Sequence, residues 1–195
     1  MIFTIIGNRD APIYERDKYV PIVKFLLRAG HTGRSGGAEC MDDVLTQAVK
    51  ELLAEGHTDI NAEIYLPKKY FNGLISGDIN GRVMNTLEFS NRSEALELAS
   101  KFHAAWHYCD EWSRNMHARN MYEIKGKDLN TPADFVLTHA KTNRNGVVMR
   151  GTATAAALAT SLNIPIFNSY VTPFDGVYDF LKEQGIDYVN MDHGE

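Results

Sequence analysis

The stretch MIFTIIG, residues 1–7, opens the sequence with an apolar, β-branched run that ends at a glycine. Such a run predicts a buried strand over residues 2–6, followed by a turn at Gly7. Over residues 14–29, apolar side chains recur at the spacing of one helical face, and Gly30 ends that pattern. A buried strand followed by an amphipathic helix is the repeating unit of a parallel α/β sheet.

The same alternation continues along the chain. A second strand is expected just before the turn at residues 34–38, and further strands and helices are predicted from apolar periodicity: strands 62–66, 134–139, 164–167 and 187–190, and helices 44–53, 93–106, 113–124, 152–162 and 174–184. Ser93 and Ser113 are expected to cap two of these helices. Residues 67–91 lack periodicity and predict a mobile loop that acts as a lid or an oligomer contact. We therefore expect one domain over residues 1–195, an α/β, Rossmann-like three-layer sandwich with a mainly parallel sheet and helices on both faces.

Composition narrows the class of protein. With 44% hydrophobic and 23% charged residues, the chain has the balance of a folded globular protein. It has no secretory signal and no long apolar run, so we expect it to stay in the cytoplasm. Two cysteines, Cys40 and Cys109, give no disulfide framework and no CxxC pair. A net charge of -5 argues against an extended nucleic acid as partner, because sequence-independent binding to phosphates needs a basic surface.

Glycine turns with arginines beside them mark the expected ligand site. In a doubly wound sheet, ligands bind beyond the carboxyl ends of the strands, where residues 7–9, 34–38 and 150–152 are expected to lie. Gly36 and Gly37 are expected to open a helix, so that their amides and the helix dipole hold an anion. The alternative is a plain turn that needs positive φ. The arginines at 9, 34 and 150 are placed to pair with phosphate.

Two further clusters lie in the middle of the sequence. On the helix predicted over residues 113–124, the side chains of Asn115, Arg119 and Tyr122 share one face, which is either a ligand surface or a solvated stripe. His103 and His107 have the i, i+4 spacing of a metal clamp, but an aromatic-rich helix explains them better, and we expect no metal. Cys40 is interpreted as a packing residue for lack of a partner base.

With these residues in view, the chain resembles the SLOG superfamily, which joins DprA/Smf proteins to LOG phosphoribohydrolases, and most of all its small bacteriophage members. The resemblance rests on residues 34–38 with Asp42, similar to an SGGAxGxD turn, on residues 117–120 (HARN), and on Gly151-Thr152; residues 132–136 and 164–168 add to it. It implies a homo-oligomer in the host cytoplasm, without a cofactor, that binds a nucleotide or nucleotide-derived small molecule. The predicted ligand-binding residues are Gly7, Arg9, Arg34, Ser35, Gly36, Gly37, Ala38, Glu39, Asn115, Arg119, Asn120, Tyr122, Arg150, Gly151 and Thr152.

Departures from the family pattern leave the activity open. LOG enzymes are similar in a PGGxGTxxE turn with a catalytic glutamate, and here Ala155 stands in its place. Relatives carry an Arg-Gly pair after the alanine of the SGGA turn, and this chain has Glu39 and Cys40 there. Glu39 puts a carboxylate beside the expected anion site. Our leading hypothesis is therefore a binder that sequesters or senses a nucleotide signal in phage counter-defence. The alternatives are a nucleotide N-glycoside hydrolase that uses Glu39 or Asp42, and a DprA-like binder of single-stranded DNA.

Overall fold

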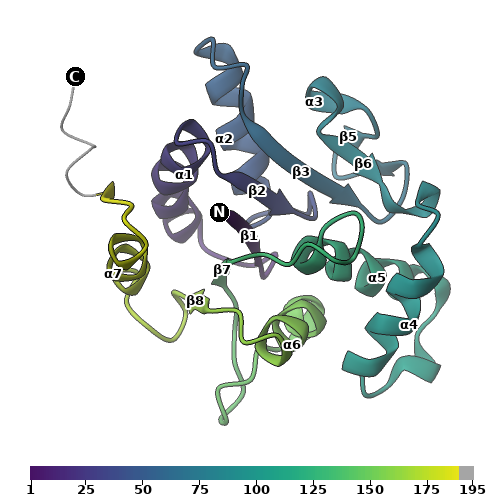
Figure 1. Ribbon diagram of the computed structural model, residues 1–195. Helices are drawn as coiled ribbons and strands as arrows, with labels where there is room; N and C mark the ends of the chain where they lie inside the picture. Colours follow the sequence, from purple (N-terminus) through teal and green to yellow (C-terminus); the bar gives the residue numbers. More distant parts are fainter. Residues whose placement is uncertain (189–195) are drawn as a thin grey trace.

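The fold is built on a six-stranded sheet in which all hydrogen-bonded neighbours run parallel. A computed structural model describes residues 1–188 of the chain (Figure 1). The strand order is β6-β3-β2-β1-β7-β8. These strands are β1 (Ile2–Gly7), β2 (Thr32–Ser35), β3 (Asn61–Leu66), β6 (Val83–Asn85), β7 (Phe135–His139) and β8 (Ile166–Asn168).

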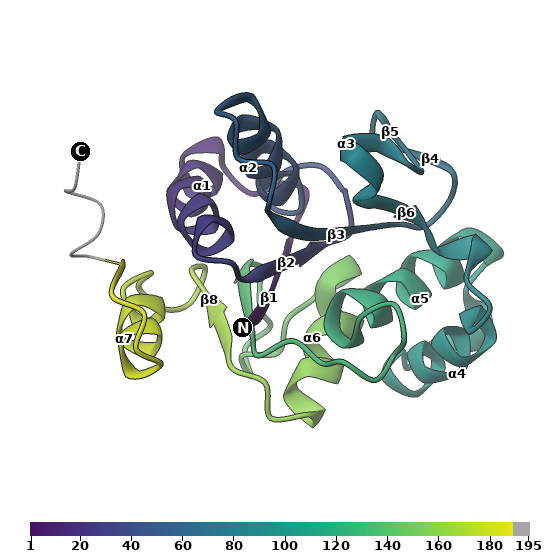
Figure 2. The same ribbon diagram turned by 45° about the horizontal axis from the view of Figure 1, so that its top comes forward.

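Helices cover both faces of this sheet. Figure 2 shows α1 (Ile13–Arg28) and α2 (Asp43–Ala54) above it, and α4 (Arg92–Phe102), α5 (Glu111–Lys125) and α6 (Ala153–Ser161) below it. Buried apolar side chains form two core clusters. One of them includes Val177 and Leu181 of α7 (Gly176–Glu183), and the other joins α4, α5 and α6 to the other face of the sheet. The predicted Rossmann-like α/β fold is confirmed. The prediction of one domain over residues 1–195 stays a prediction.

The prediction that residues 67–91 form a loop is wrong, because this segment contains secondary structure. It holds a short antiparallel hairpin and the edge strand β6, together with a short helix and a 3-10 turn: β4 (Tyr70–Phe71), β5 (Leu74–Ile75), α3 (Asp78–Gly81) and η1 (Thr86–Glu88). The edge strand β6 needs few apolar residues, because it is only three residues long and pairs on one side with β3. Short strands of this kind escape a search for periodicity.

Three helix starts also differ from the sequence-based expectation. Helix α2 begins at Asp43 and not at the glycine pair, so Gly36 and Gly37 lie in the loop before it. Helix α5 is capped by Asp110, whose carboxylate accepts from the backbone amide of Ser113 at 2.8 Å, and α4 follows Asn91. The 3-10 turn η3 (Arg150–Thr152) precedes α6. The edge strand expected at 187–190 lies mostly outside the described residues.

No helix between residues 1 and 188 is both long enough and apolar enough to cross a membrane.

Candidate functional site

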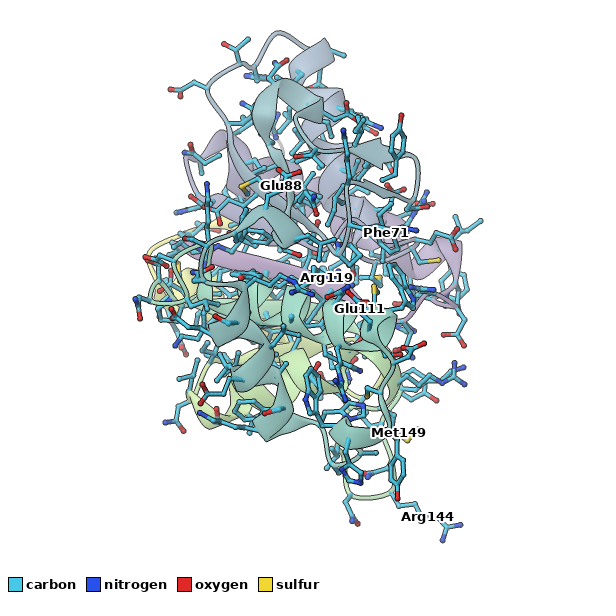
Figure 3. The ribbon with its side chains drawn as sticks, turned by 90° about the vertical axis from the view of Figure 1, so that its right-hand side faces the viewer. Phe71, Glu88, Glu111, Arg119, Arg144 and Met149 are labelled. Carbon is cyan, nitrogen blue, oxygen red and sulfur yellow. The ribbon has the colours of Figure 1, made fainter. Side chains whose placement is uncertain are left out.

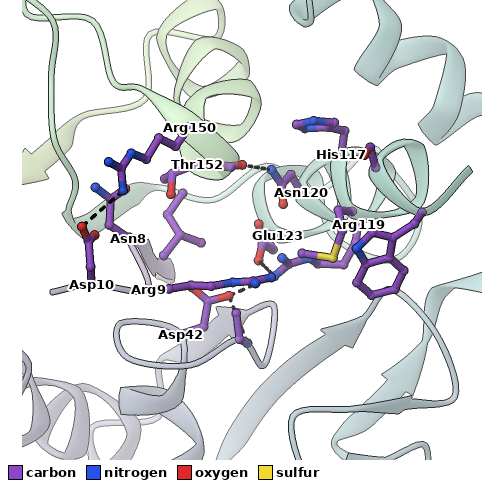
Figure 4. A pocket seen from close by; sticks show the side chains of 17 residues that line it. Asn8, Arg9, Asp10, Asp42, His117, Arg119, Asn120, Glu123, Arg150 and Thr152 are labelled. Carbon is purple, nitrogen blue, oxygen red and sulfur yellow. Dashed lines mark hydrogen bonds and ion pairs between the residues drawn. The ribbon is translucent and has the colours of Figure 1, made fainter. Parts of the chain in front are cut away.

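A cavity of about 460 Å³ opens at the carboxyl edge of the sheet, between the turn after β1, helix α5 and η3 (Figure 4). The chain runs from β1 outward through β2 and β3, and later returns on the other side of β1 with β7. The reversal of strand order therefore falls between β1 and β7, where a doubly wound sheet offers its binding crevice. The lining residues are Ile6, Gly7, Asn8, Arg9, Asp10, Ala38, Asp42, Trp112, Ser113, Met116, His117, Arg119, Asn120, Glu123, Arg150, Gly151 and Thr152.

A buried charge cluster forms one wall of this cavity. The guanidinium of Arg119 contacts Asp42 at 2.9 Å and Glu123 at 2.6 Å, and all three side chains are at most 5% exposed. Figure 3 shows Arg119 in the interior, between the sheet and α5. Burial raises the pKa of Glu123 to about 8, with the Asp42 charge adding to the shift and Arg119 opposing it. A protonated Glu123 leaves one carboxylate, that of Asp42, to balance the single guanidinium charge at neutral pH.

The loop of Gly36 and Gly37, which precedes α2, packs against this charge cluster. A Cβ atom at Gly36 would overlap with the guanidinium of Arg119 and the carboxylate of Glu123. The carboxylate of Asp42 accepts from the amide of Ala38 at 3.4 Å, so the protein places its own anion against the loop. Gly37 has φ +63°, and a Cβ there would lie 2.8 Å from Leu66. These contacts give a packing reason for both glycines.

The opposite rim carries an exposed ion-pair cluster. Asp10 contacts Lys141 at 2.7 Å and Arg150 at 3.2 Å. The hydrogen bond from Lys141 lowers the pKa of Asp10, with burial opposing the shift. Arg9, also on the rim, has no carboxylate partner among residues 1–188. The rim therefore offers one cation, Arg9, whose charge is not committed within the described chain.

The strongest sign of a ligand is Asn8. The residue lines the cavity and is 5% exposed, and neither the oxygen nor the nitrogen of its buried side-chain amide has a hydrogen-bond partner in the described chain. Leaving a buried polar group unpaired costs roughly 1–3 kcal/mol. The nearby Asn120 is different, since its amide donates to the Gly151 carbonyl at 2.7 Å and to Thr154 at 2.9 Å.

An aromatic surface stands at the mouth of the cavity. Trp112, the second residue of α5, is 40% exposed and lines the cavity. The ring of Phe71 lies 6.0 Å from it, and the ammonium of Lys68 lies 4.9 Å from the centre of its ring. Figure 3 shows Phe71 on the same side of the molecule as Arg144 and Met149 of the loop that precedes η3. A half-exposed indole beside a cation is suited to stacking on a flat ligand.

The structure brings part of the predicted site together. The predicted residues that line the cavity are Gly7, Arg9, Ala38, Arg119, Asn120, Arg150, Gly151 and Thr152, with Asp42 from the hydrolase alternative. The residues that the predicted set lacks are Ile6, Asn8, Asp10, Trp112, Ser113, Met116, His117 and Glu123. Two of these had a signal: Asn8 lies inside the predicted turn 7–9, and Glu123 has the i, i+4 spacing to Arg119 of a helical ion pair. Ligand binding by any of these residues stays a prediction.

The structure places the remaining predicted residues elsewhere. Arg34 is 3% exposed and donates to Glu63 and to the Thr131 carbonyl, both at 2.6 Å, beside a separate cavity of about 920 Å³. Tyr122 is buried in the core and donates to Asn91. Asn115 accepts from Arg92. Ser35, Gly36 and Gly37 are buried in or just after β2, and Glu39 is exposed outside the cavity lining.

The proposed acid/base groups of the hydrolase alternative are separated in space and role. Asp42 is bound to Arg119, whereas Glu39 does not line the cavity. Ala155 is fully buried in α6. The side chain in the place of the LOG glutamate therefore belongs to the core and not to the cavity wall.

Comparison with known proteins gives a likeness of fold. No family model matches the chain, and no curated protein matches it in sequence. A solved structure, described as giving insights into the unique single-stranded DNA binding mode of DNA processing protein A from Helicobacter pylori, is similar with a TM-score of 0.52 and 16% identity. The match covers 95% of this chain and 73% of that chain.

This likeness supports the DprA-like Rossmann fold that the sequence resemblance implied; membership among small bacteriophage proteins stays a prediction. It also corrects the expectation that no extended nucleic acid is a partner. A protein of the same fold is described as binding single-stranded DNA, so a net charge of -5 does not exclude that class of ligand. Local cations at a site, and not the total charge of the chain, decide the matter.

Proposed function

We propose that this protein binds single-stranded DNA and seats one nucleotide in the cavity at the carboxyl edge of the sheet. The proposal depends on Asn8, a residue of the cavity lining. Its buried side-chain amide has no hydrogen-bond partner in the described chain. The fold likeness to a protein described as a binder of single-stranded DNA supports the choice of ligand class.

The Asn8 amide offers what a base edge requires. An asparagine side chain presents one acceptor and two donors, and a nucleobase edge presents donors and acceptors side by side. A base in the cavity that reached the buried amide, with a small shift of the side chain, would supply the hydrogen bonds that Asn8 lacks and remove the cost of its unpaired amide. Trp112 at the mouth would stack on a neighbouring base, a contact worth roughly 1–3 kcal/mol per base.

Few phosphates would be neutralised in such a complex. Arg9 lines the cavity, Lys68 lies over the ring of Trp112 next to it, and Arg150 is already paired with Asp10. Each phosphate neutralised on a single strand lowers log K by about 0.7 per unit of log salt concentration. Two such contacts predict a shallow slope of about -1.4, unlike the steep slope of a protein that coats nucleic acid.

Fluorescence anisotropy with labelled oligonucleotides on the order of ten nucleotides long tests the proposal. Wild-type protein should bind, and Asn8→Ala should weaken binding by at least about tenfold while the free energy of unfolding stays equal or rises, because an unpaired amide has been removed. Failure of the wild type to bind any homopolymer would overturn the proposal.

Asn168 provides the matched control. It has the same 5% exposure, but its amide oxygen accepts from Ala140 and Tyr170 and its nitrogen donates to the Ala140 carbonyl. Asn168→Ala should therefore lower stability without a selective effect on binding. If both variants lose affinity only in proportion to lost stability, Asn8 has no special role in binding.

A free nucleotide is the second candidate, as the sequence resemblance implied. Its support is the size of the cavity, about 460 Å³, which lies within the range of single small-ligand sites. Competition separates the two candidates. A mononucleotide that displaces the labelled oligonucleotide at comparable concentration would favour a free nucleotide as ligand, and an oligonucleotide that binds at least about a hundredfold more tightly would favour DNA, since stacked neighbours add affinity.

A further inference from the structure

Three side chains with nitrogen and sulfur donors converge beside the cavity. His103 follows α4, Cys109 follows the 3-10 turn η2 (Trp106–Tyr108), and His117 lies on α5. One ligand atom from each lies within 4.8 Å of the others. The imidazole rings of His103 and His117 have centroids 4.4 Å apart, and the Cys109 sulfur lies 3.7 Å from Nδ1 of His103.

We propose that His103, Cys109 and His117 bind a Zn²⁺ ion. Zinc takes thiolate sulfur and imidazole nitrogen in tetrahedral sites, with Zn–S near 2.3 Å and Zn–N near 2.1 Å, so a sulfur and a nitrogen on one ion lie roughly 3.6 Å apart. The observed separation of 3.7 Å between the Cys109 sulfur and His103 Nδ1 matches that value. Three protein ligands leave a fourth position for water.

The surroundings of His117 fit the role of a ligand. Its Nδ1 lies 3.1 Å from the hydroxyl oxygen of Thr154, which is itself buried and also accepts from Asn120. A metal-bound histidine commonly uses its second ring nitrogen in a hydrogen bond that fixes the ring. Thr154 would hold His117 in this way and leave Nε2 for the ion.

The i, i+4 spacing in the sequence suggests His103 and His107 as a pair of ligands, but the structure groups His103 with His117. His107 has the i, i+4 spacing to His103, but the helix ends at Phe102, so that spacing has no helical meaning there. His107 is exposed, packs against Tyr108 and lies outside the convergent group. The three ligands instead come from a turn and a helix that meet in space, which a search for i, i+4 pairs does not find.

A bound ion would also tie the segment between α4 and α5 to α5. Two of the ligands, His103 and Cys109, lie in that connection, whereas His117 lies within α5 and lines the cavity. The ion would thus stand next to the cavity, with the same helix forming both sites. The zinc site is argued from its own ligands and does not depend on the nature of the cavity's ligand.

The test uses the full chain, reduced and stripped of metal, with no nucleic acid present. Zn²⁺ is titrated in competition with a chromogenic chelator, and Co²⁺ is added separately as a spectroscopic probe. We expect one equivalent of Zn²⁺ per chain and a near-ultraviolet thiolate-to-cobalt band. Cys109→Ser should abolish that band, and both Cys109→Ser and His103→Ala should weaken Zn²⁺ binding by at least about a hundredfold, since even outer-shell changes cost up to that factor.

The chain supplies two matched controls. Cys40→Ser removes the other cysteine, which contacts the Arg9 carbonyl, and His107→Ala removes the histidine outside the group. Both should bind Zn²⁺ as the wild type does, and circular dichroism should show all four variants folded. Absence of stoichiometric binding in the wild type, or a cobalt band that survives Cys109→Ser, would overturn the proposal.

Discussion

Two glycine turns at the carboxyl edge of the sheet look alike in sequence and differ in structure. The loop of Gly36 and Gly37 is packed from within, by Arg119 and Glu123 on one side and by Leu66 on the other. A Cβ atom at Gly151 would meet nothing within 4 Å, and this residue lines the cavity. A glycine beside an arginine therefore does not by itself identify a ligand site: at Gly36 the protein's own charge cluster approaches the backbone, whereas at Gly151 nothing in the described chain does.

The largest effect is expected from Gly36→Ala. The new methyl group would displace the Arg119 guanidinium and leave Asp42 and Glu123 without their buried partner. Breaking a buried ion pair in this way costs about 3–5 kcal/mol. Urea denaturation should show this loss in the free energy of unfolding, and a variant of unchanged stability would show that the cluster can relocate.

Gly37→Val is expected to follow. Its φ of +63° strains any β-branched side chain, and a Cβ would lie 2.8 Å from Leu66 and 3.2 Å from Ile64. We expect a loss of about 2–4 kcal/mol, from strain and overpacking together. Melting temperature and oligonucleotide affinity are measured on the same sample. Reduced stability with unchanged affinity supports packing as the role of this loop, whereas a selective loss of affinity would return the loop to the site.

The charge cluster predicts a pH dependence of stability. Because the pKa of Glu123 is raised to about 8 from an ordinary value of 4.5, its contribution to stability is present at low pH and is lost as pH rises between those values. Between pH 5 and 7 the wild type should lose about 2 kcal/mol relative to Glu123→Gln, which cannot titrate. Denaturation curves at several pH values measure this difference, and a wild type that keeps or gains stability relative to Glu123→Gln between pH 5 and 7 would contradict it.

The smallest effect on stability is expected from Gly151→Ala. The position is open and its φ is not in the left-handed region, so the free energy of unfolding should change by less than about 0.5 kcal/mol. Gly151 lines the cavity, so a methyl group there tests whether a ligand approaches this backbone. A measurable fall in affinity at unchanged stability would complete the contrast with Gly36; unchanged affinity would place the ligand away from η3.

Local periodicity was enough to predict the layers of the fold. The apolar run of β1 and the helical face of α1 are signals within a few residues, and their repetition implies parallel strands. The pairing of Arg34 with Glu63 had no such signal. These residues face each other only through the register of β2 and β3, which sequence spacing does not set. Arg34 was therefore predicted at the ligand site, although its partner is 29 residues away in the sequence.

The candidate site was predictable where its residues lie on turns and hidden where it depends on packing. Gly7, Arg9 and Gly151 follow from the rule that ligands bind at the carboxyl ends of strands. Asn8 sits in the same turn, but its significance is an unmet hydrogen bond, which exists only once the surrounding chain is folded. Trp112 is likewise an ordinary helical aromatic until the hairpin residue Phe71 comes beside it.

The two outermost strands of the sheet bear on how copies of this protein meet. Strands β6 and β8 have three residues each, and Pro165, which has no amide hydrogen, stands just before β8. Short edges interrupted by proline give an incoming strand little backbone to pair with. Self-association by continuing the sheet from one copy into the next is thus disfavoured, and crowded solutions of the folded protein should resist the growth of intermolecular β-structure.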